Sequence, residues 1–163
     1  MPIIEESIDI AVGPADVFRF CHDAAIRPEW DEQVLRVEFL TPPPMRAGTL
    51  LRIDAKPGGG STVFSWDAEV VTYQFPLSST VRVLDTAYSS PFGPGSQVNW
   101  AFSSSGGGTR VTWTWKYKPR GFIASIRNML GGRAATQRAI RNSLKNLKTL
   151  LEGGRRAGAS SGS

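Results

Sequence analysis

Cysteine and histidine are almost missing from this sequence. Its 163 residues include one cysteine, Cys21, and one histidine, His22. A single cysteine excludes an internal disulfide framework, and one residue of each kind is too few for a Cys/His zinc site. We therefore expect neither a metal ion nor another cofactor.

Long apolar runs are missing as well. No stretch approaches the ~18 uninterrupted apolar residues of a membrane-spanning helix. The opening residues, MPIIEESIDI, carry acids where a secretory signal carries Lys or Arg. Hydrophobic residues make up 40% of the chain and charged residues 20%, which suits a domain with a core and not a disordered chain. We expect one soluble, cytoplasmic domain.

Charge is distributed unevenly along the chain. The net charge is +5, but residues 120–163 hold nine basic residues and one acid, whereas residues 1–119 are net −3. Such asymmetry occurs in proteins that contact nucleic acid or anionic membranes. It also occurs on solvated helix faces, which is the interpretation we favour.

The first part of the chain predicts one strand and two short helices. Residues 3–10 alternate weakly, as in a strand. Pro14 suits the first turn of a helix that runs to Cys21, and Asp23 can cap a second, irregular helix over residues 24–30.

The middle of the chain predicts an antiparallel sheet. Trp100 and Trp113 lie in two alternating segments joined by three glycines, which indicates a hairpin with one aromatic and one polar face. Tyr117 ends the second segment and is expected on the same face as Trp113. We expect strands at residues 35–39, 49–54, 62–73, 81–83, 97–102 and 111–117.

A long amphipathic helix is predicted to follow. Its apolar residues fall at spacings of three and four, and Gly131-Gly132 interrupts the pattern. After Gly153 we expect a flexible, basic tail, so residues 1–152 form the domain and residues 153–163 the tail. The residues at these spacings form a stripe that is expected to face the sheet. They are Ile123, Ile126, Leu130, Ala134, Gln137, Ile140, Leu144, Leu147 and Leu151.

This order of elements predicts a pocket. The sheet has one apolar face, and the terminal helix is the one element large enough to cover it. A twisted sheet curves away from a straight helix, which leaves space between the two. Aromatic side chains would line that space, as in many small-molecule sites.

The chain resembles a known family from Ile4 to Leu151. The matching features are the opening strand IEESIDI, the helix start Gly-Pro-Ala-Asp-Val-Phe, the segment Asp23 … Pro28-Glu29-Trp30, the hairpin around GGGTRVTWTWKY and the closing helix RAIRNSLKNLKTLLE. Together they are similar to the START-like (SRPBCC) superfamily, with its helix-grip or birch-pollen-allergen fold, in the polyketide cyclase/dehydrase-like branch. The resemblance implies an α+β fold in which about seven curved antiparallel strands (β-α-α-β6-α) wrap around the last helix, and a cavity for a lipid, polyketide or similar ligand.

Aromatic side chains are the first candidates for contact with such a ligand. Tryptophans in the inward phase of the strands together predict a pocket wall, although for each of them alone a place in the core is the favoured interpretation. Trp30 lies in the short helix that the resemblance places at the end of the pocket. The candidate ligand-binding residues are Trp30, Phe64, Trp66, Asp85, Trp100, Phe102, Trp113, Trp115 and Tyr117.

Inward polar groups are the candidates for orienting a ligand or for acid–base chemistry. Asp85, Tyr117 and Glu6 share the phase of buried neighbours, while the phase of Arg52 is ambiguous. Cys21 and His22 are adjacent on a helix, about 100° apart, so they are poorly placed to share a proton. We expect Cys21 to be a core residue.

Three functions remain open. The first is binding of a small hydrophobic molecule between sheet and helix. The second is a cyclase or dehydratase that works without a metal in the same pocket, with positioning and one acid–base pair. The third is contact of the basic helix with an anionic membrane or a partner. Nucleic acid is not an expected partner because the aromatic residues face inward, and the sequence leaves open a monomer or a homodimer.

Overall fold

The computed structural model describes residues 1–84 and 91–160, except for the side chains of residues 122, 124, 125 and 155–160. The described elements follow the predicted order, with one strand, two short helices, six strands and a helical end. The strands are β1 (Ile3–Ile10), β2 (Val34–Phe39), β3 (Leu50–Ala55), β4 (Phe64–Gln74), β5 (Ser78–Val83), β6 (Gln97–Ser105) and β7 (Gly108–Lys116). The helices are α1 (Pro14–Cys21), α2 (Arg27–Trp30), η1 (Pro57–Gly59), α3 (Gly121–Arg127), η2 (Asn128–Gly132) and α4 (Arg133–Ser160).

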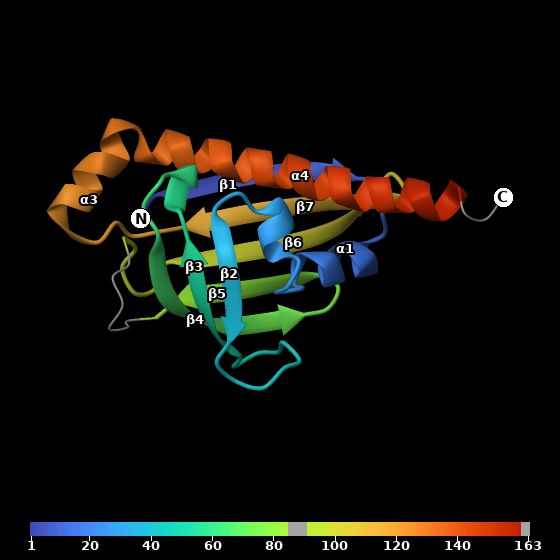
Figure 1. The fold of residues 1–163 in the computed structure, drawn as a ribbon, viewed down its shortest axis with the longest axis horizontal. Helices are drawn as coiled ribbons and strands as arrows, with labels where there is room; N and C mark the ends of the chain where they lie inside the picture. Colours follow the sequence, from blue (N-terminus) through green and yellow to red (C-terminus); the bar gives the residue numbers. More distant parts are fainter. Residues whose placement is uncertain (85–90, 161–163) are drawn as a thin grey trace.

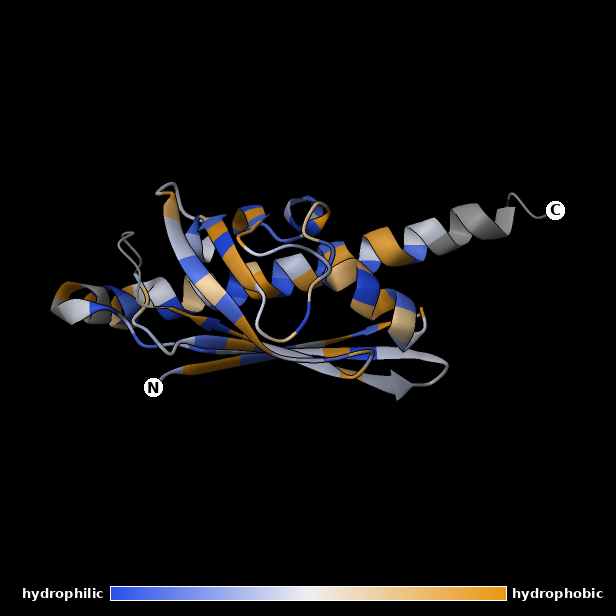
Figure 2. Cartoon of the chain, turned by 90° about the horizontal axis from the view of Figure 1, so that it is seen from below, coloured by the Kyte–Doolittle hydropathy of each residue, from blue (hydrophilic) through white to orange (hydrophobic). Residues whose placement is uncertain are grey.

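The seven strands form one antiparallel sheet in the order β1-β7-β6-β5-β4-β3-β2. Strands β2 to β7 therefore follow each other as a meander, and β1 joins at the far edge by pairing with β7. The helices α1, α2 and α4 all lie on the concave side of the sheet (Figures 1 and 2). The predicted α+β architecture is confirmed.

The aromatic hairpin is formed by β6 and β7. Trp100 pairs with Trp113 and Phe102 with Val111, so the predicted inward rows lie side by side on the sheet. Gly106 and Gly107 form the turn with φ angles of 55° and 84°. Two successive positive φ values match the right-handed twist of a hairpin, and glycine adopts them without a steric cost.

The predicted terminal helix is divided at the two glycines. Gly131 has φ 123°, which breaks the helix and sends η2 and α3 in another direction from α4. Figure 1 shows α3 beyond the end of the sheet and α4 across β1 and β7. Ile123, Ile126 and Leu130 are exposed as a result. The prediction that these three residues continue the buried stripe of the long helix is wrong.

The rest of the predicted helix is α4. Ala134 in its first turn is exposed, so its predicted place in the buried stripe is also wrong, but the following turns cover the core as expected. Ile140, Leu144 and Leu147 are buried against β1, β6 and β7 together with residues of α1 and α2. The helix α4 continues past Gly153 to Ser160. The division into a domain of residues 1–152 and a tail of residues 153–163 stays a prediction.

Candidate functional site

An inner cavity lies between the middle of the sheet, α2 and α4. Its volume is about 90 Å³, and its walls are mainly aliphatic and aromatic side chains. Ala55, Ala68 and Val83 come from neighbouring strands whose inward residues alternate with outward ones, so small side chains leave this space open. The lining residues are Arg27, Asp31, Gln33, Val34, Ile53, Ala55, Pro57, Trp66, Ala68, Val81, Val83, Phe92, Val98, Trp113, Trp115, Thr136 and Ile140.

A second cavity of about 60 Å³ adjoins the first, toward the end of α1. Cys21, His22 and Trp100 line it, and it shares Arg27 and four aliphatic residues with the inner cavity. The Arg27 side chain therefore belongs to the wall between the two spaces.

Arg27 and Asp31 form a buried ion pair at that wall. Arg27 Nε donates to Asp31 Oδ2 at 2.8 Å, and Nη2 lies 2.8 Å from the same oxygen. The Asp31 side chain is 1% exposed. Asp31 Oδ1 accepts the backbone N–H of Gln33 at 3.0 Å. A buried carboxylate needs such partners, because burial without them is costly.

Three indole rings surround the Arg27 guanidinium. Its Cζ atom lies 4.8 Å from the ring centre of Trp30, 5.2 Å from that of Trp100 and 5.5 Å from that of Trp113. Cations are attracted to the negative faces of aromatic rings, most strongly to Trp. Among the described residues, Nη1 of Arg27 has no hydrogen-bond partner. The pair thus offers a bound molecule a polar donor next to an apolar wall.

Hydrogen bonds from α4 hold α2 in place over the cavity. Asn146 Nδ2 donates to the backbone oxygen of Trp30 at 3.2 Å, and Ser143 Oγ accepts the backbone N–H of Glu32 at 3.0 Å. The α2 helix has only four residues, and a helix of that length is not stable by itself. The contacts with α4 stabilise it.

An outer groove of about 430 Å³ lies at the end of the sheet next to α3. It shares Pro57, Phe92 and Thr136 with the inner cavity, so these residues stand between the two spaces. Its other lining residues are Gly58, Phe64, Pro91, Tyr117, Pro119, Arg120, Ile123, Arg127, Asn128, Gly132 and Ala135.

The predicted aromatic site residues are divided among these spaces. Trp66, Trp113 and Trp115 line the inner cavity, Trp100 the second cavity, and Phe64 and Tyr117 the outer groove. Trp30 and Phe102 pack in the core instead, Trp30 edge-on to Trp100 and Phe102 against Phe18. Their contact with a ligand, like that of the others, stays a prediction.

The polar candidates lie apart from each other. Asp85 falls outside the described residues. Tyr117 donates a hydrogen bond to Asn128 Oδ1, and burial raises the pKa of its phenol. Glu6 faces inward as expected, but its carboxylate accepts hydrogen bonds from Gln137 and Arg141 of α4. Arg52 is paired with Asp67 on the neighbouring strand, at 2.9 Å from Nε to Oδ1.

Burial keeps Cys21 and His22 in their neutral forms. Burial raises the pKa of the Cys21 thiol to about 12, so the predicted core role is confirmed. His22 Nδ1 donates to the backbone oxygen of Phe18 at 2.7 Å, and Nε2 accepts from the Ser79 hydroxyl at 2.7 Å. Both bonds suit a neutral imidazole. Burial lowers the pKa of His22 to about 4.

This histidine should make the protein sensitive to acid. The pKa of His22 rises from about 4 in the folded chain toward 6.5 on unfolding, so the unfolded chain binds the proton more tightly. The stabilisation is complete above pH 6.5 and falls as the pH drops toward 4. We expect a loss of about 2–3 kcal/mol in the free energy of unfolding between neutral pH and the lower end of this window.

Urea unfolding at a series of pH values measures this loss. The variant His22→Gln should show a clearly flatter dependence over the same window, since glutamine does not titrate. An equal slope in both proteins would assign the acid sensitivity to carboxylates elsewhere.

Sequence reasoning missed the polar pair of the inner cavity and Phe92. Arg27 and Asp31 are four residues apart next to Trp30, which is the spacing of an ion pair on one helix face, so a signal was present. Phe92 is the one large apolar residue of segment 91–95, which otherwise consists of proline and glycine. Among the described residues, no group of three or more His, Cys, Asp or Glu side chains is placed to hold a metal ion.

The sequence also matches the model of a known protein family. The model for "Polyketide cyclase / dehydrase and lipid transport" matches residues 1–152. The chain belongs to this family. The match covers every strand of the sheet and most of α4, so it includes all residues of the inner cavity. Among proteins of curated function, none matches the sequence.

Solved structures share the fold of this family member. Protein TTHA0849 from Thermus thermophilus has a TM-score of 0.76 and 20% identity, over 94% of this chain and 99% of that one. Protein Ms6760 from Mycobacterium smegmatis has a TM-score of 0.64 and 15% identity, over 93% and 92%. Ara h 8.0201 has a TM-score of 0.63 and 10% identity, over 93% and 98%. The predicted helix-grip fold is thereby confirmed. Within the described part of the chain, every helix is too short or too polar to span a bilayer.

Proposed function

We propose that this protein binds a small hydrophobic molecule in the inner cavity. The observation that supports the proposal most is the cavity itself, an apolar space beneath α4 walled by Trp66, Trp113 and Trp115, with the pair Arg27–Asp31 at one side. Apolar walls with a few fixed polar groups are typical of small-molecule sites. The family model, which names lipid transport, points to the same class of ligand.

The polar pair suggests what kind of oxygen the ligand carries. Asp31 already balances the charge of Arg27, so a bound carboxylate would face a neutral pair. Nη1 of Arg27 remains available to donate to a neutral oxygen, such as a ketone or an ester carbonyl. We infer a ligand with an apolar body that fits against indole rings and one such acceptor.

The size of the cavity implies that binding needs an opening of the walls. About 90 Å³ is well below the ~300–1,000 Å³ of pockets that hold drug-sized ligands. The second cavity and the outer groove adjoin it, so displacement of Arg27 or Phe92 would enlarge it. Small movements of side chains at a site on ligand binding are common.

Filling the cavity should abolish binding. Ala68 is buried in the cavity wall on β4, and Ala68→Phe places a ring in the space a ligand would occupy. We expect the affinity for the neutral apolar dye N-phenyl-1-naphthylamine, titrated by its fluorescence, to fall about tenfold or more. Ala101→Phe makes the same change at an exposed position of β6 and should leave the affinity unchanged.

Two further measurements keep this test decisive. Ala55→Leu fills the same cavity with a smaller side chain, in case Ala68→Phe unfolds the protein. Mass spectrometry of extracts from protein purified from its native host should find an apolar molecule in stoichiometric amount. Unchanged dye affinity in both folded cavity variants would contradict the proposal.

Catalysis by a cyclase or dehydratase mechanism has less support. The alternative requires an acid–base pair in the cavity, but Glu6 and Arg52 bind other protein groups, and Tyr117 lies in the outer groove. Arg27 and Asp31 are the titratable residues that line the inner cavity, and they are paired with each other. We therefore propose binding as the function.

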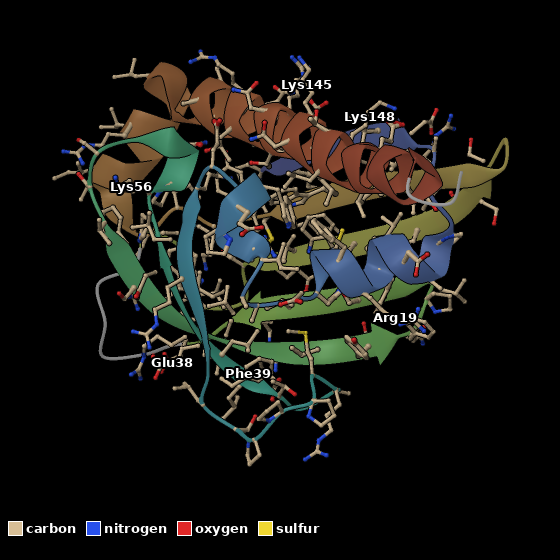
Figure 3. All side chains as sticks on the ribbon, turned by 45° about the vertical axis from the view of Figure 1, so that its right-hand side comes forward. Arg19, Glu38, Phe39, Lys56, Lys145 and Lys148 are labelled. Carbon is tan, nitrogen blue, oxygen red and sulfur yellow. The ribbon has the colours of Figure 1, made fainter. Side chains whose placement is uncertain are left out.

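The remaining predictions of the sequence stay proposals. The basic face of α4 would contact an anionic membrane, and Lys145 projects outward from this helix (Figure 3). Two of its cations are partly neutralised, because Arg141 pairs with Glu6 and Lys148 with Glu152. A cytoplasmic location, and a monomer or homodimer without nucleic acid, complete the proposal.

A further inference from the structure

An apolar surface is exposed where α3 and η2 leave the sheet. The side chains of Ile123, Ile126, Met129 and Leu130, here named the α3–η2 face, are 67%, 38%, 85% and 81% exposed. Single exposed apolar residues are normal, but four of them within eight residues indicate an interaction site. Figure 2 shows apolar colour on this segment, at the end of the molecule far from the C-terminus.

The bend at Gly131 is the cause of this exposure. In a continuous helix, the three- and four-residue spacing of these side chains would direct them toward the sheet. The positive φ of Gly131, 123°, instead turns them away from it. Glycine tolerates this conformation and other residues do so at a cost. The sequence thus places apolar residues on a face that the fold does not bury.

The charge around the face indicates the kind of surface it meets. Residues 118–133 contain Lys118, Arg120, Arg127 and Arg133 and no acid. Arg127 is exposed beside the apolar residues. A second copy of this chain, with its net charge of +5, would bring a like-charged segment against this one. An anionic surface with an apolar interior complements both features.

We propose that the α3–η2 face inserts into the interface of an anionic lipid bilayer. Helical segments with Leu, Ile or Met on one side and Arg or Lys on the other bind membranes in this way, with the apolar side chains below the headgroups. The face borders the outer groove, because Ile123 and Arg127 line it. Insofar as the protein binds a hydrophobic molecule, which rests on the proposed function, docking here would set the groove against the bilayer.

Vesicle sedimentation with the full chain tests this proposal. We expect binding to vesicles of equal parts phosphatidylglycerol and phosphatidylcholine, none to phosphatidylcholine alone, and weakening by salt. The double variant Met129→Ser/Leu130→Ser should bind at least about tenfold less. Val63→Ser/Leu77→Ser removes two other exposed apolar side chains, 52% and 62% exposed, and should bind as the wild type does.

The outcomes separate this proposal from ligand binding in the cavity. Loss of vesicle binding in Met129→Ser/Leu130→Ser with unchanged dye affinity supports the α3–η2 face, and Ala68→Phe should show the reverse pattern. Equal sedimentation with both vesicle types, or wild-type binding by Met129→Ser/Leu130→Ser, would overturn it. So would a wild-type dimer in light scattering that this variant converts to a monomer, because a second copy would then cover the face.

Discussion

Replacement of Arg27 by methionine should lower the free energy of unfolding by about 3–5 kcal/mol, the usual cost of removing one member of a buried ion pair. The reason is Asp31, whose side chain is 1% exposed and would lose both contacts with the guanidinium. Methionine keeps much of the length and apolar stem of arginine, so the effect reports mainly on charge. Urea unfolding at neutral pH measures it.

A double variant identifies the lost charge pair as the cause. Asp31→Asn removes the charge but retains an oxygen for the backbone N–H of Gln33, so Arg27→Met/Asp31→Asn should recover at least half of the loss. Arg36→Met alters an exposed ion pair and should change stability little. A loss below about 1 kcal/mol for Arg27→Met would contradict this expectation, because the pair would then contribute no more than an exposed one.

Truncation of Trp30 should destabilise the protein by a similar amount. Its side chain is fully buried between Trp100, Trp113 and the Arg27 guanidinium. Trp30→Ala should therefore lower the free energy of unfolding by about 3–5 kcal/mol, as large-to-small changes in cores do. Thermal or urea unfolding followed by far-UV circular dichroism measures this loss.

Two comparisons show whether Trp30 acts through packing. Trp30→Phe should cost clearly less, because it keeps an aromatic ring and removes an indole N–H that has no partner among the described residues. Trp115→Ala should also cost less than Trp30→Ala, since Trp115 is only partly buried and borders the cavity. Equal losses for the alanine variants would mean that Trp115 packs as tightly as Trp30.

Most of the sheet could be predicted because its two faces differ. Trp100 and Trp113 alternate with polar residues, and such alternation with a period of two indicates a strand with one buried face. The direction of α3 could not be predicted in this way. The apolar spacing continues across Gly131, and periodicity carries no information on the angle between two helical segments.

The candidate site was predictable in part for a related reason. Phase alone places Trp66, Trp113 and Trp115 on the concave side, where they line the inner cavity. Arg27 and Asp31 resemble surface charges of a short helix in the sequence. Their burial depends on indoles of strands far along the chain and on α4, which no local pattern reveals.

The place of β1 in the sheet has a consequence for biosynthesis. Strands β2 to β7 can pair in the order in which they leave the ribosome, each with its predecessor. The first strand must wait for β7, since Ile3 pairs with Lys116. Closing so long a loop is slow, and α4, which packs on β1, emerges later still. The hollow that would receive a guest molecule therefore exists only after β7 and α4 have been translated.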